Sequence, residues 1–361
     1  MRLFQLLAMT AAALSLASAA TAAPRPVGER HLETANPTAA LRDSEHSAKV
    51  RVTVWYPAAE GSVERSLDLG PPGQPEFYVG EAAPDADFAD AKRRPVILFS
   101  HGFGGTARMM GWFTTVMAQQ GYIVIAVDHP GNNNLDKMTV AGATLVWDRS
   151  GDLEAALETV KVDPVIGPHL DVKRLGVAGY ATGGLTALVA AGARVDIKRF
   201  QTFCAAHPVD GVCSPQQEFP VTQDQAMMAL ASPELSPEAA HAGDDHAIRG
   251  VRAAFAIAPA FVQALDPASM AAMNTPVAIV LGDADPIAAP HSNGGAAARA
   301  IPRAQLKALP GVGHYDFLST CNPAARARAA PLCQNAVPQG QTHFAALEMA
   351  LNFFGSVMGP P

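Results

Sequence analysis

The stretch Gly179-Tyr180-Ala181-Thr182-Gly183-Gly184 follows the short apolar run Leu175 to Ala178 and precedes a segment rich in Ala and Leu. An apolar run, a glycine-flanked turn and a helix-forming segment predict a strand, a sharp turn and a helix. The turn matches the pattern G-x-S-x-G except at its centre, where Ala181 replaces serine. The glycines of that pattern make room for a strained central residue, at a cost of roughly 1 to 3 kcal/mol. Ala181 carries this strain without the hydroxyl group that the frame normally presents.

The segments around this turn alternate between strand-like and helix-like patterns, which predicts an α/β fold with a mostly parallel sheet covered by helices on both faces. With 361 residues, 49% hydrophobic and 16% charged, the chain suits one large domain or two small ones. The expected strands are Val96 to Phe99, Ile123 to Val127, Leu175 to Ala178, Val251 to Ile257, Val277 to Leu281 and Gln305 to Leu309. The expected helices are Thr106 to Gln120, Asp152 to Val160, Gly183 to Ala193 and Gln341 to Phe354.

The beginning of the chain has the pattern of a secretory signal peptide. A cationic start at Arg2 leads into an apolar stretch that ends in the cleavage pattern Ala20-Thr21-Ala22, with Ala17-Ser18-Ala19 as an alternative. A membrane anchor is the other interpretation, but the apolar run is short and no basic cluster follows it. We therefore expect a signal peptide at 1–22 and a periplasmic or secreted protein without a stable membrane anchor.

Further boundaries follow from composition. A polar, turn-rich segment covers 23–48, and the alternating run Lys49 to Tyr56 predicts the first strand of a domain at 49–357. Residues 199–248 interrupt the alternation of strands and helices, so we expect them to form an insertion over the carboxyl edge of the sheet. The net charge of −7 disfavours nucleic acid and anionic membrane surfaces as partners.

Four cysteines in an exported chain predict disulfides. Four cysteines allow three connectivities, and we expect sequence neighbours to pair, Cys204 with Cys213 and Cys321 with Cys333. A metal site is the alternative, but the close C-x₂₋₄-C spacing that it usually needs is absent.

Three further turns follow predicted strands and carry chemistry. Ser100-His101-Gly102-Phe103-Gly104-Gly105 exposes backbone N–H groups, as the binding of a developing oxyanion requires. Downstream, Gly282-Asp283-Ala284-Asp285-Pro286 supplies an acid and Pro310-Gly311-Val312-Gly313-His314 supplies a base. The order of nucleophile position, acid and histidine is that of the triad in α/β-hydrolases.

On these motifs, the chain resembles the α/β-hydrolase superfamily over roughly residues 49 to 355. Within it, the WYPA, HGFGG and HYDFL segments look most like secreted dienelactone hydrolases and platelet-activating-factor-acetylhydrolase-like esterases. The resemblance implies an α/β-hydrolase fold, a small-molecule or polymeric ester substrate and no cofactor or metal. It makes Phe103 and Thr182 the oxyanion amides, Asp285 the orienting acid and His314 the general base. The sequence leaves the oligomeric state open.

The alanine has three explanations. An engineered serine-to-alanine change, made to stall the reaction, explains why the acid and the base remain, and we favour it. Natural loss of catalysis is the second explanation, and a displaced nucleophile at Thr182 is the third. The first predicts an ester hydrolase present in an inactive form, whereas the second predicts a ligand-binding pseudohydrolase.

Neighbouring residues have competing roles. We expect Tyr315 and Phe317 to line a substrate pocket, Asp283 to serve as a turn residue, and His101 to be a structural hydrogen-bonder. His241, Asp244, Asp245 and His246 form the one metal-like cluster of the sequence, although such residues more often cap helices or lie in solvent.

A dinucleotide-binding oxidoreductase is the rival from another class. Gly102 to Ala107 fits G-x-G-x-x-[G/A], and Asp128 follows about 20 residues later. The second glycine turn, with its downstream acid and histidine, argues against this alternative.

Overall fold

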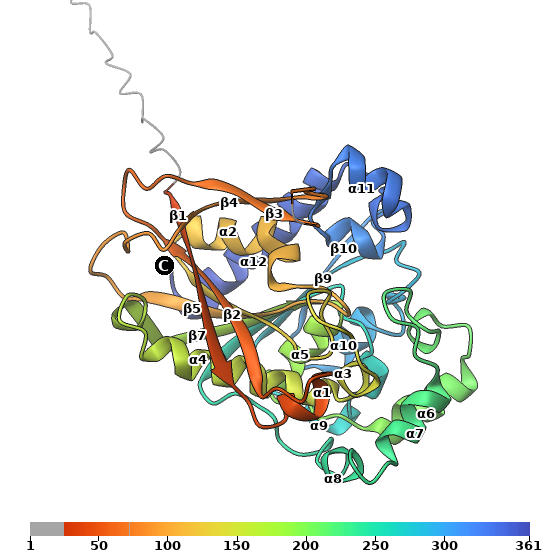
Figure 1. Ribbon diagram of the computed structural model, residues 1–361. Helices are drawn as coiled ribbons and strands as arrows, with labels where there is room; N and C mark the ends of the chain where they lie inside the picture. Colours follow the sequence, from red (N-terminus) through yellow and green to blue (C-terminus); the bar gives the residue numbers. More distant parts are fainter. Residues whose placement is uncertain (1–24, 72) are drawn as a thin grey trace, which may run out of the picture.

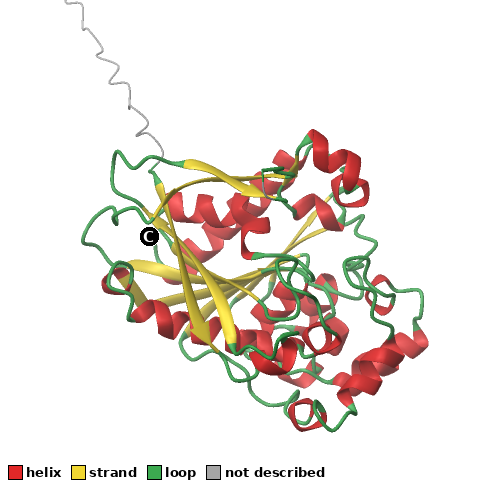
Figure 2. Ribbon diagram, in the orientation of Figure 1, coloured by secondary structure: helices red, strands yellow, loops and turns green. Residues whose placement is uncertain are grey.

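A computed structural model describes residues 25–71 and 73–361 of the chain. The signal peptide predicted at 1–22 therefore lies outside the described residues. The described strands form one 11-stranded sheet, and Figures 1 and 2 show this sheet with helices on both of its faces. The predicted α/β class and its mostly parallel sheet are confirmed.

The sheet is parallel along one half and mostly antiparallel along the other, where only β1 and β4 pair in parallel. Strands follow the order β10-β9-β8-β7-β5-β6-β2-β1-β4-β11, with β3 paired to β4. Strands β5 to β10 pair in parallel, whereas β2 is antiparallel to both β6 and β1. The strands are β1 Val27–Ala35, β2 Lys49–Pro57, β3 Arg65–Leu69, β4 Phe77–Pro84, β5 Arg94–Ser100, β6 Ile123–Asp128, β7 Leu170–Tyr180, β8 Val251–Ile257, β9 Val277–Gly282, β10 Gln305–Leu309 and β11 Thr320–Cys321.

Helices cover both faces because the parallel strands are apolar on both sides; every residue of β6 and β9 is buried. Helices α2 and α12 pack on one face, where Phe113 and Phe354 join one hydrophobic core. Helices α4 and α5 pack on the other face, where Leu153 and Leu185 join a second core. The helices are α1 Ala39–Arg42, α2 Gly111–Gln119, α3 Val140–Thr144, α4 Arg149–Lys161, α5 Thr182–Ala190, α6 Ile197–Ala206, α7 Gln223–Leu230, α8 Ser236–Ala239, α9 Pro267–Ala271, α10 Gly294–Ala300, α11 Pro323–Arg328 and α12 Gln339–Met358.

The two outlying segments of the prediction have structure of their own. The segment 23–48 contributes β1 to the sheet, paired antiparallel with β2. The segment 199–248 contains most of α6 and all of α7 and α8, which lie together at the lower right of Figure 1. None of the described helices is long and apolar enough to cross a membrane.

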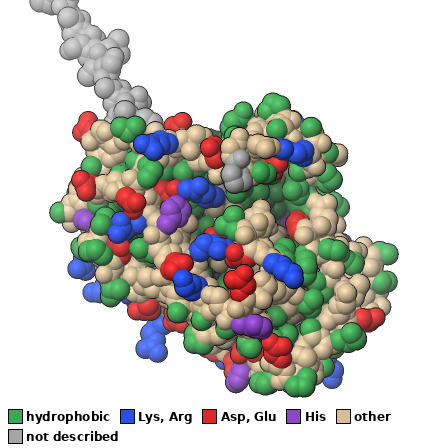
Figure 3. Space-filling view, viewed as in Figure 1, with side chains coloured by type: hydrophobic (Ala, Val, Ile, Leu, Met, Phe, Trp, Pro, Cys, Tyr) green, Lys and Arg blue, Asp and Glu red, His purple; other side chains and the backbone are tan. Residues whose placement is uncertain are grey.

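The two disulfides join the cysteines that are neighbours in sequence, Cys204 with Cys213 and Cys321 with Cys333. On the face viewed in Figure 3, acidic and basic side chains are interspersed rather than gathered by sign. Strands β5, β7, β9 and β10 are parallel, so the turns that follow them meet at one edge of the sheet. This edge holds the candidate site.

Candidate active site

Ala181 lies in the sharp turn between β7 and α5, with φ 51° and ψ −116°. This backbone conformation, with a positive φ, is unfavourable for a residue with a Cβ atom. The flanking glycines are required by space. A Cβ atom at Gly179 would lie 2.1 Å from the carbonyl oxygen of Gly183, and one at Gly183 would lie 1.9 Å from that of Ser100. The turn thus has the tight packing and the strained centre that the sequence pattern predicts.

The predicted acid and base are in contact. Nδ1 of His314 lies 2.6 Å from Oδ2 of Asp285, and the side chains are 6% and 1% exposed. Because a carboxylate accepts hydrogen bonds, Nδ1 carries a proton toward Asp285, and Nε2 is the ring nitrogen that has a lone pair when the ring is neutral. Burial alone would raise the pKa of Asp285, but the charge and hydrogen bond of His314, with the N–H groups of Ala288 and Ile287, hold this pKa below its usual value. Asp283 instead accepts the N–H of Gly311 and closes the turn.

A cavity of ≈ 270 Å³ joins these parts. Its walls include Ala181, His314 and the glycine turn from His101 to Gly105. A Cβ atom at Gly102 would lie 3.4 Å from Cβ of Ala181, which shows how closely the two turns pack. Tyr180 donates a hydrogen bond from its hydroxyl to the backbone oxygen of His314, at 3.0 Å. Position 181 and the histidine therefore border one space that a small ligand could enter.

The predicted oxyanion amides border the same cavity, since Phe103 and Thr182 both line it. Within the described residues, no hydrogen bond is found from the N–H of either one.

Hydrogen bonds to neighbouring segments hold the glycine turn in place. Gly104 donates its N–H to Oδ1 of Asn132 at 2.8 Å. His101 donates from Nδ1 to the carbonyl of Gly102, and its Nε2 accepts the N–H of His129. Both ring nitrogens of His101 are occupied by the backbone, which fits a structural role.

The two predicted substrate-binding aromatic residues differ. Tyr315 lines the cavity, and its hydroxyl donates to Oε1 of Glu218 at 2.9 Å. The prediction for Phe317 was wrong, because its side chain is 0% exposed and packs in the hydrophobic core. The reason is the short 3-10 helix His314–Phe317, which turns Phe317 away from His314 and toward the core.

The segment 199–248 reaches over the site. Its residues Gln216 and Glu218 line the cavity. A Cβ atom at Gly104 would lie only 2.9 Å from Cβ of Glu218, so this loop touches the glycine turn. Sequence analysis did not find Gln216 or Glu218, because nothing local in their segment marks them as cavity residues.

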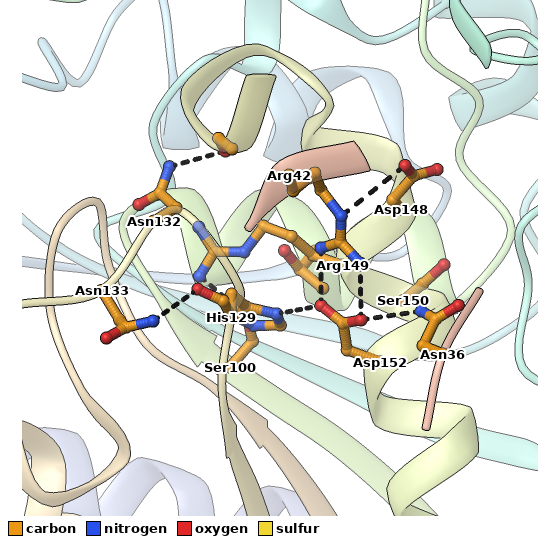
Figure 4. Close-up of polar contacts among 12 residues, drawn as sticks. Asn36, Arg42, Ser100, His129, Asn132, Asn133, Asp148, Arg149, Ser150 and Asp152 are labelled. Carbon is orange, nitrogen blue, oxygen red and sulfur yellow. Dashed lines mark hydrogen bonds and ion pairs between the residues drawn. The ribbon is translucent and has the colours of Figure 1, made fainter. Parts of the chain in front are cut away.

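A second set of serine, histidine and aspartate lies behind the glycine turn, in a place that sequence analysis also missed. Ser100 Oγ lies 2.9 Å from Nε2 of His129, and Nδ1 of His129 lies 2.8 Å from Oδ2 of Asp152. Asp152 also binds Arg42 through both of its oxygens, and Arg149 donates to the carbonyl of His101. Figure 4 shows Asp152 at the centre of this network.

This second set is sealed. Ser100, His129 and Asp152 are each 0% exposed, and none of them lines the cavity at Ala181. Burial, and then the charge of Arg149, lower the pKa of His129 to about 3. Burial also acts to raise the pKa of Asp152, but Arg42 and His129 outweigh it and hold this pKa well below its usual value. A nucleophile must contact its substrate and its base must accept a proton, so the set has the geometry of a catalytic triad without the access.

The other sequence candidates are engaged elsewhere. Asp128 is buried, and its Oδ1 accepts the N–H of Ala107 at 2.9 Å, so this carboxylate closes the glycine turn itself. His241 and Asp244 form an exposed pair at 2.8 Å. Among the described residues, no group of three or more His, Cys, Asp or Glu side chains is arranged to hold a metal ion.

Comparisons with known proteins show what the chain is similar to. Residues 91–318 match the model of the family described as serine aminopeptidase, S33. Over 104 residues the chain is 32% identical to a cutinase of Thermobifida alba, covering 28% of this chain and 31% of the cutinase. The match thus spans about a third of that relative's length.

A solved structure shows the same fold over nearly the whole chain. It is a ferulic acid esterase from Streptomyces cinnamoneus, with a TM-score of 0.61 and 19% identity, covering 94% of this chain and 92% of the other. Together with the family match over 91–318, this similarity identifies the α/β-hydrolase fold. The chain belongs to the α/β-hydrolase family described as serine aminopeptidase, S33.

Proposed function

We propose that the cavity at Ala181 is the active site of a serine-type carboxylic ester hydrolase, present here without its nucleophile. The observation that carries the proposal is His314, which lines the cavity together with the strained residue Ala181 and is held at 2.6 Å by Asp285. An acid, a base and a strained turn have no shared structural reason to converge on one cavity. The names of the similar proteins, a cutinase and a ferulic acid esterase, favour an ester as substrate.

The mechanism follows from the geometry once serine stands at position 181. Nε2 of His314, with Nδ1 held by Asp285, removes the hydroxyl proton as the oxygen attacks the ester carbonyl. The N–H groups of Phe103 and Thr182 stabilise the oxyanion, at about 3 kcal/mol for each donor. His314 then protonates the leaving alcohol and activates the water that releases the acid. With Ala181, the chain has the acid, the base and the oxyanion amides but lacks the hydroxyl group that makes the first attack.

The compartment and the partners belong to the same proposal. Both disulfides are formed, and such bonds persist in oxidising compartments outside the cytosol. We propose a periplasmic or secreted enzyme that acts on a small-molecule or polymeric ester. Charges of both signs are interspersed on the face in Figure 3, which gives no support for a nucleic acid partner there.

The proposal is tested by the variant Ala181→Ser, assayed on p-nitrophenyl butyrate. The expected result is a rise in kcat of about 10⁶-fold, the usual effect of a catalytic serine. Ala191→Ser is the matched control, because Ala191 is 8% exposed at the end of α5 and does not line the cavity. We expect no gain from it.

Two results would contradict the proposal. The first is a rate for Ala181→Ser that stays at the level of the Ala191→Ser control. The second is a larger gain on amino acid p-nitroanilides than on esters, which would make the site a peptidase.

A further inference from the structure

A second pocket lies beside the catalytic cavity, beneath the inserted segment. Its walls come from α3, α6, α7 and the loop after Cys213, with Trp147, Phe200, Val212, Phe219, Ala226 and Phe261 among the lining residues. We propose that this second pocket binds the acyl arm of the ester, as an unbranched alkyl chain. The proposal rests on the proposed function and names the substrate class of that site.

The two spaces adjoin. Phe103, Gln216 and Phe261 line both the catalytic cavity and the second pocket. Phe103 thus has its backbone N–H at the oxyanion position and contributes to the second pocket as well. An alkyl chain that extends from the ester carbonyl carbon toward Phe103 therefore has a short path from the catalytic cavity into the second pocket.

Phe261 is held in its place at a conformational cost. Its backbone is left-handed, with φ 61° and ψ 21°, which is sparsely populated by bulky residues. The preceding residue Ala260 donates its N–H to the carbonyl of Ala181 at 3.1 Å. The ring of Phe261 meets that of Phe200 edge-on, with centroids 5.8 Å apart. Strained residues persist where the surrounding structure fixes them, and they cluster at functional sites. Phe261 therefore links the turn at Ala181 to the wall of the second pocket.

The position of the second pocket relative to His314 identifies which part of the ester it binds. His314 must protonate the leaving alcohol, so the alcohol lies beside His314 and its neighbour Tyr315. Among the described residues, no member of the segment 314–332 lines the second pocket. The walls that the two spaces share are Phe103 of the glycine turn, Gln216 of the inserted segment and Phe261, and none of them belongs to the turn that carries the base. The acyl arm is the part of the ester that extends in this direction.

The size and chemistry of the pocket identify an alkyl chain. Its volume is ≈ 110 Å³, somewhat smaller than the apolar cavity of about 150 Å³ that holds a benzene ring. No Asp, Glu, Lys or Arg is found among its described lining residues. A flexible chain of a few methylene groups fits such a space, whereas a charged or bulky acyl group does not.

A disulfide and close packing hold the loop that covers the second pocket. The disulfide of Cys204 with Cys213 joins α6 to the loop that supplies Val212 and Gln216. A Cβ atom at Gly211 would lie 2.4 Å from the carbonyl oxygen of Ile287, so the same loop packs on the segment that follows Asp285. The pocket is thus fixed relative to the acid and the cavity.

The test uses the Ala181→Ser enzyme and the p-nitrophenyl esters of acetate, butyrate, hexanoate and octanoate. Each methylene buried in the pocket should raise kcat/KM about fourfold until the pocket is full. We expect a gain of roughly 10²-fold from acetate to hexanoate and a plateau beyond it. The pocket is then filled from α7 by Ala226→Leu and, separately, from α3 by Ala143→Leu. Each should lower the hexanoate-to-acetate ratio of kcat/KM about tenfold.

Ala231→Leu is the matched control, because Ala231 is exposed at the end of α7 and does not line the pocket. We expect it to keep the ratio. If the enzyme is active and neither filling variant changes the ratio, the pocket does not bind the acyl arm, while the proposed function stands.

A binding measurement separates the two proposals. Of the three tryptophans, only Trp147 lines the second pocket. In the chain with Ala181, the methyl ester of ω-bromohexanoate should quench Trp147 fluorescence, and Ala226→Leu should abolish the quenching. That result supports an alkyl site even if Ala181→Ser shows no esterase activity. Quenching that persists in Trp147→Phe would show that the bromoalkyl group binds outside the second pocket, and it would overturn the inference.

Discussion

Two sets of side chains near the glycine turn each contain a histidine bonded to an aspartate, and only one of them borders the cavity that a substrate can enter. In each set a histidine bonds an aspartate through Nδ1, at 2.6 Å for His314 and at 2.8 Å for His129. The Nε2 atom of His129 meets the hydroxyl of Ser100, whereas His314 borders the cavity at Ala181. The set with a serine is sealed, and the set with access has an alanine. Residue types and spacing alone therefore do not identify an active site.

The charges around the two histidines differ as well. Arg42 and Arg149 surround the sealed set, and the pKa of His129 is lowered to about 3, first by burial and then by Arg149. No Lys or Arg is found among the described residues that line the cavity of His314. A base must take up a proton near the working pH, which His129 cannot do. The sealed network holds the glycine turn in place, and we expect the accessible pair to perform the chemistry.

The largest expected effect on turnover comes from a substitution of Asp285, the acid of the accessible set. In the Ala181→Ser enzyme, Asp285→Asn should lower kcat about 10⁴-fold, because the amide no longer holds His314 with its proton on Nδ1. Steady-state kinetics on p-nitrophenyl butyrate measure this loss. Asp283→Asn is the control, since that residue only closes the turn at Gly311. Equal losses from the two substitutions would remove Asp285 from the mechanism.

An intermediate effect is expected from the pH dependence of folding stability. The pKa of His129 is about 3 in the folded chain, against an ordinary value of 6.5, so the unfolded chain binds the extra proton between these values. Stability is fully present above about pH 6.5 and falls as the pH approaches 3. The loss from this one residue should be roughly 4 kcal/mol in the unfolding free energy.

Urea unfolding at about pH 7 and about pH 4 measures this dependence. His129→Gln should flatten it, because a glutamine does not titrate, whereas the exposed His46→Gln should leave it unchanged. Stability that stays level down to about pH 4 in the unmodified chain would show that His129 is not held in its neutral form.

Some of this site could be predicted from local sequence and some could not. The parallel strands β5 to β10, the glycine turns and the pair of Asp285 with His314 were predictable, because parallel strands bring their carboxyl ends to one edge. The strands β1, β3 and β4 were not predicted, because their segments are polar and rich in turn residues. Phe317 was not, since the 3-10 helix that turns it inward has no strong local signal. The network of Ser100 with His129 and Asp152 joins β5, a loop after β6 and α4, so only tertiary packing brings it together.

The smallest expected effect is also the one that decides between the two serine positions. In the Ala181→Ser enzyme, Ser100→Ala removes the hydrogen bond to Nε2 of His129 and leaves that buried nitrogen without a partner. The cost should be about 1 to 3 kcal/mol in the unfolding free energy measured in urea. The kcat on p-nitrophenyl butyrate should change by less than about threefold, because Ser100 is 0% exposed and touches no substrate. A loss of kcat approaching 10⁶-fold in folded protein would instead show that Ser100 is the nucleophile and that position 181 takes no part in the chemistry. Turnover therefore responds differently under the two assignments, and a single substitution distinguishes them.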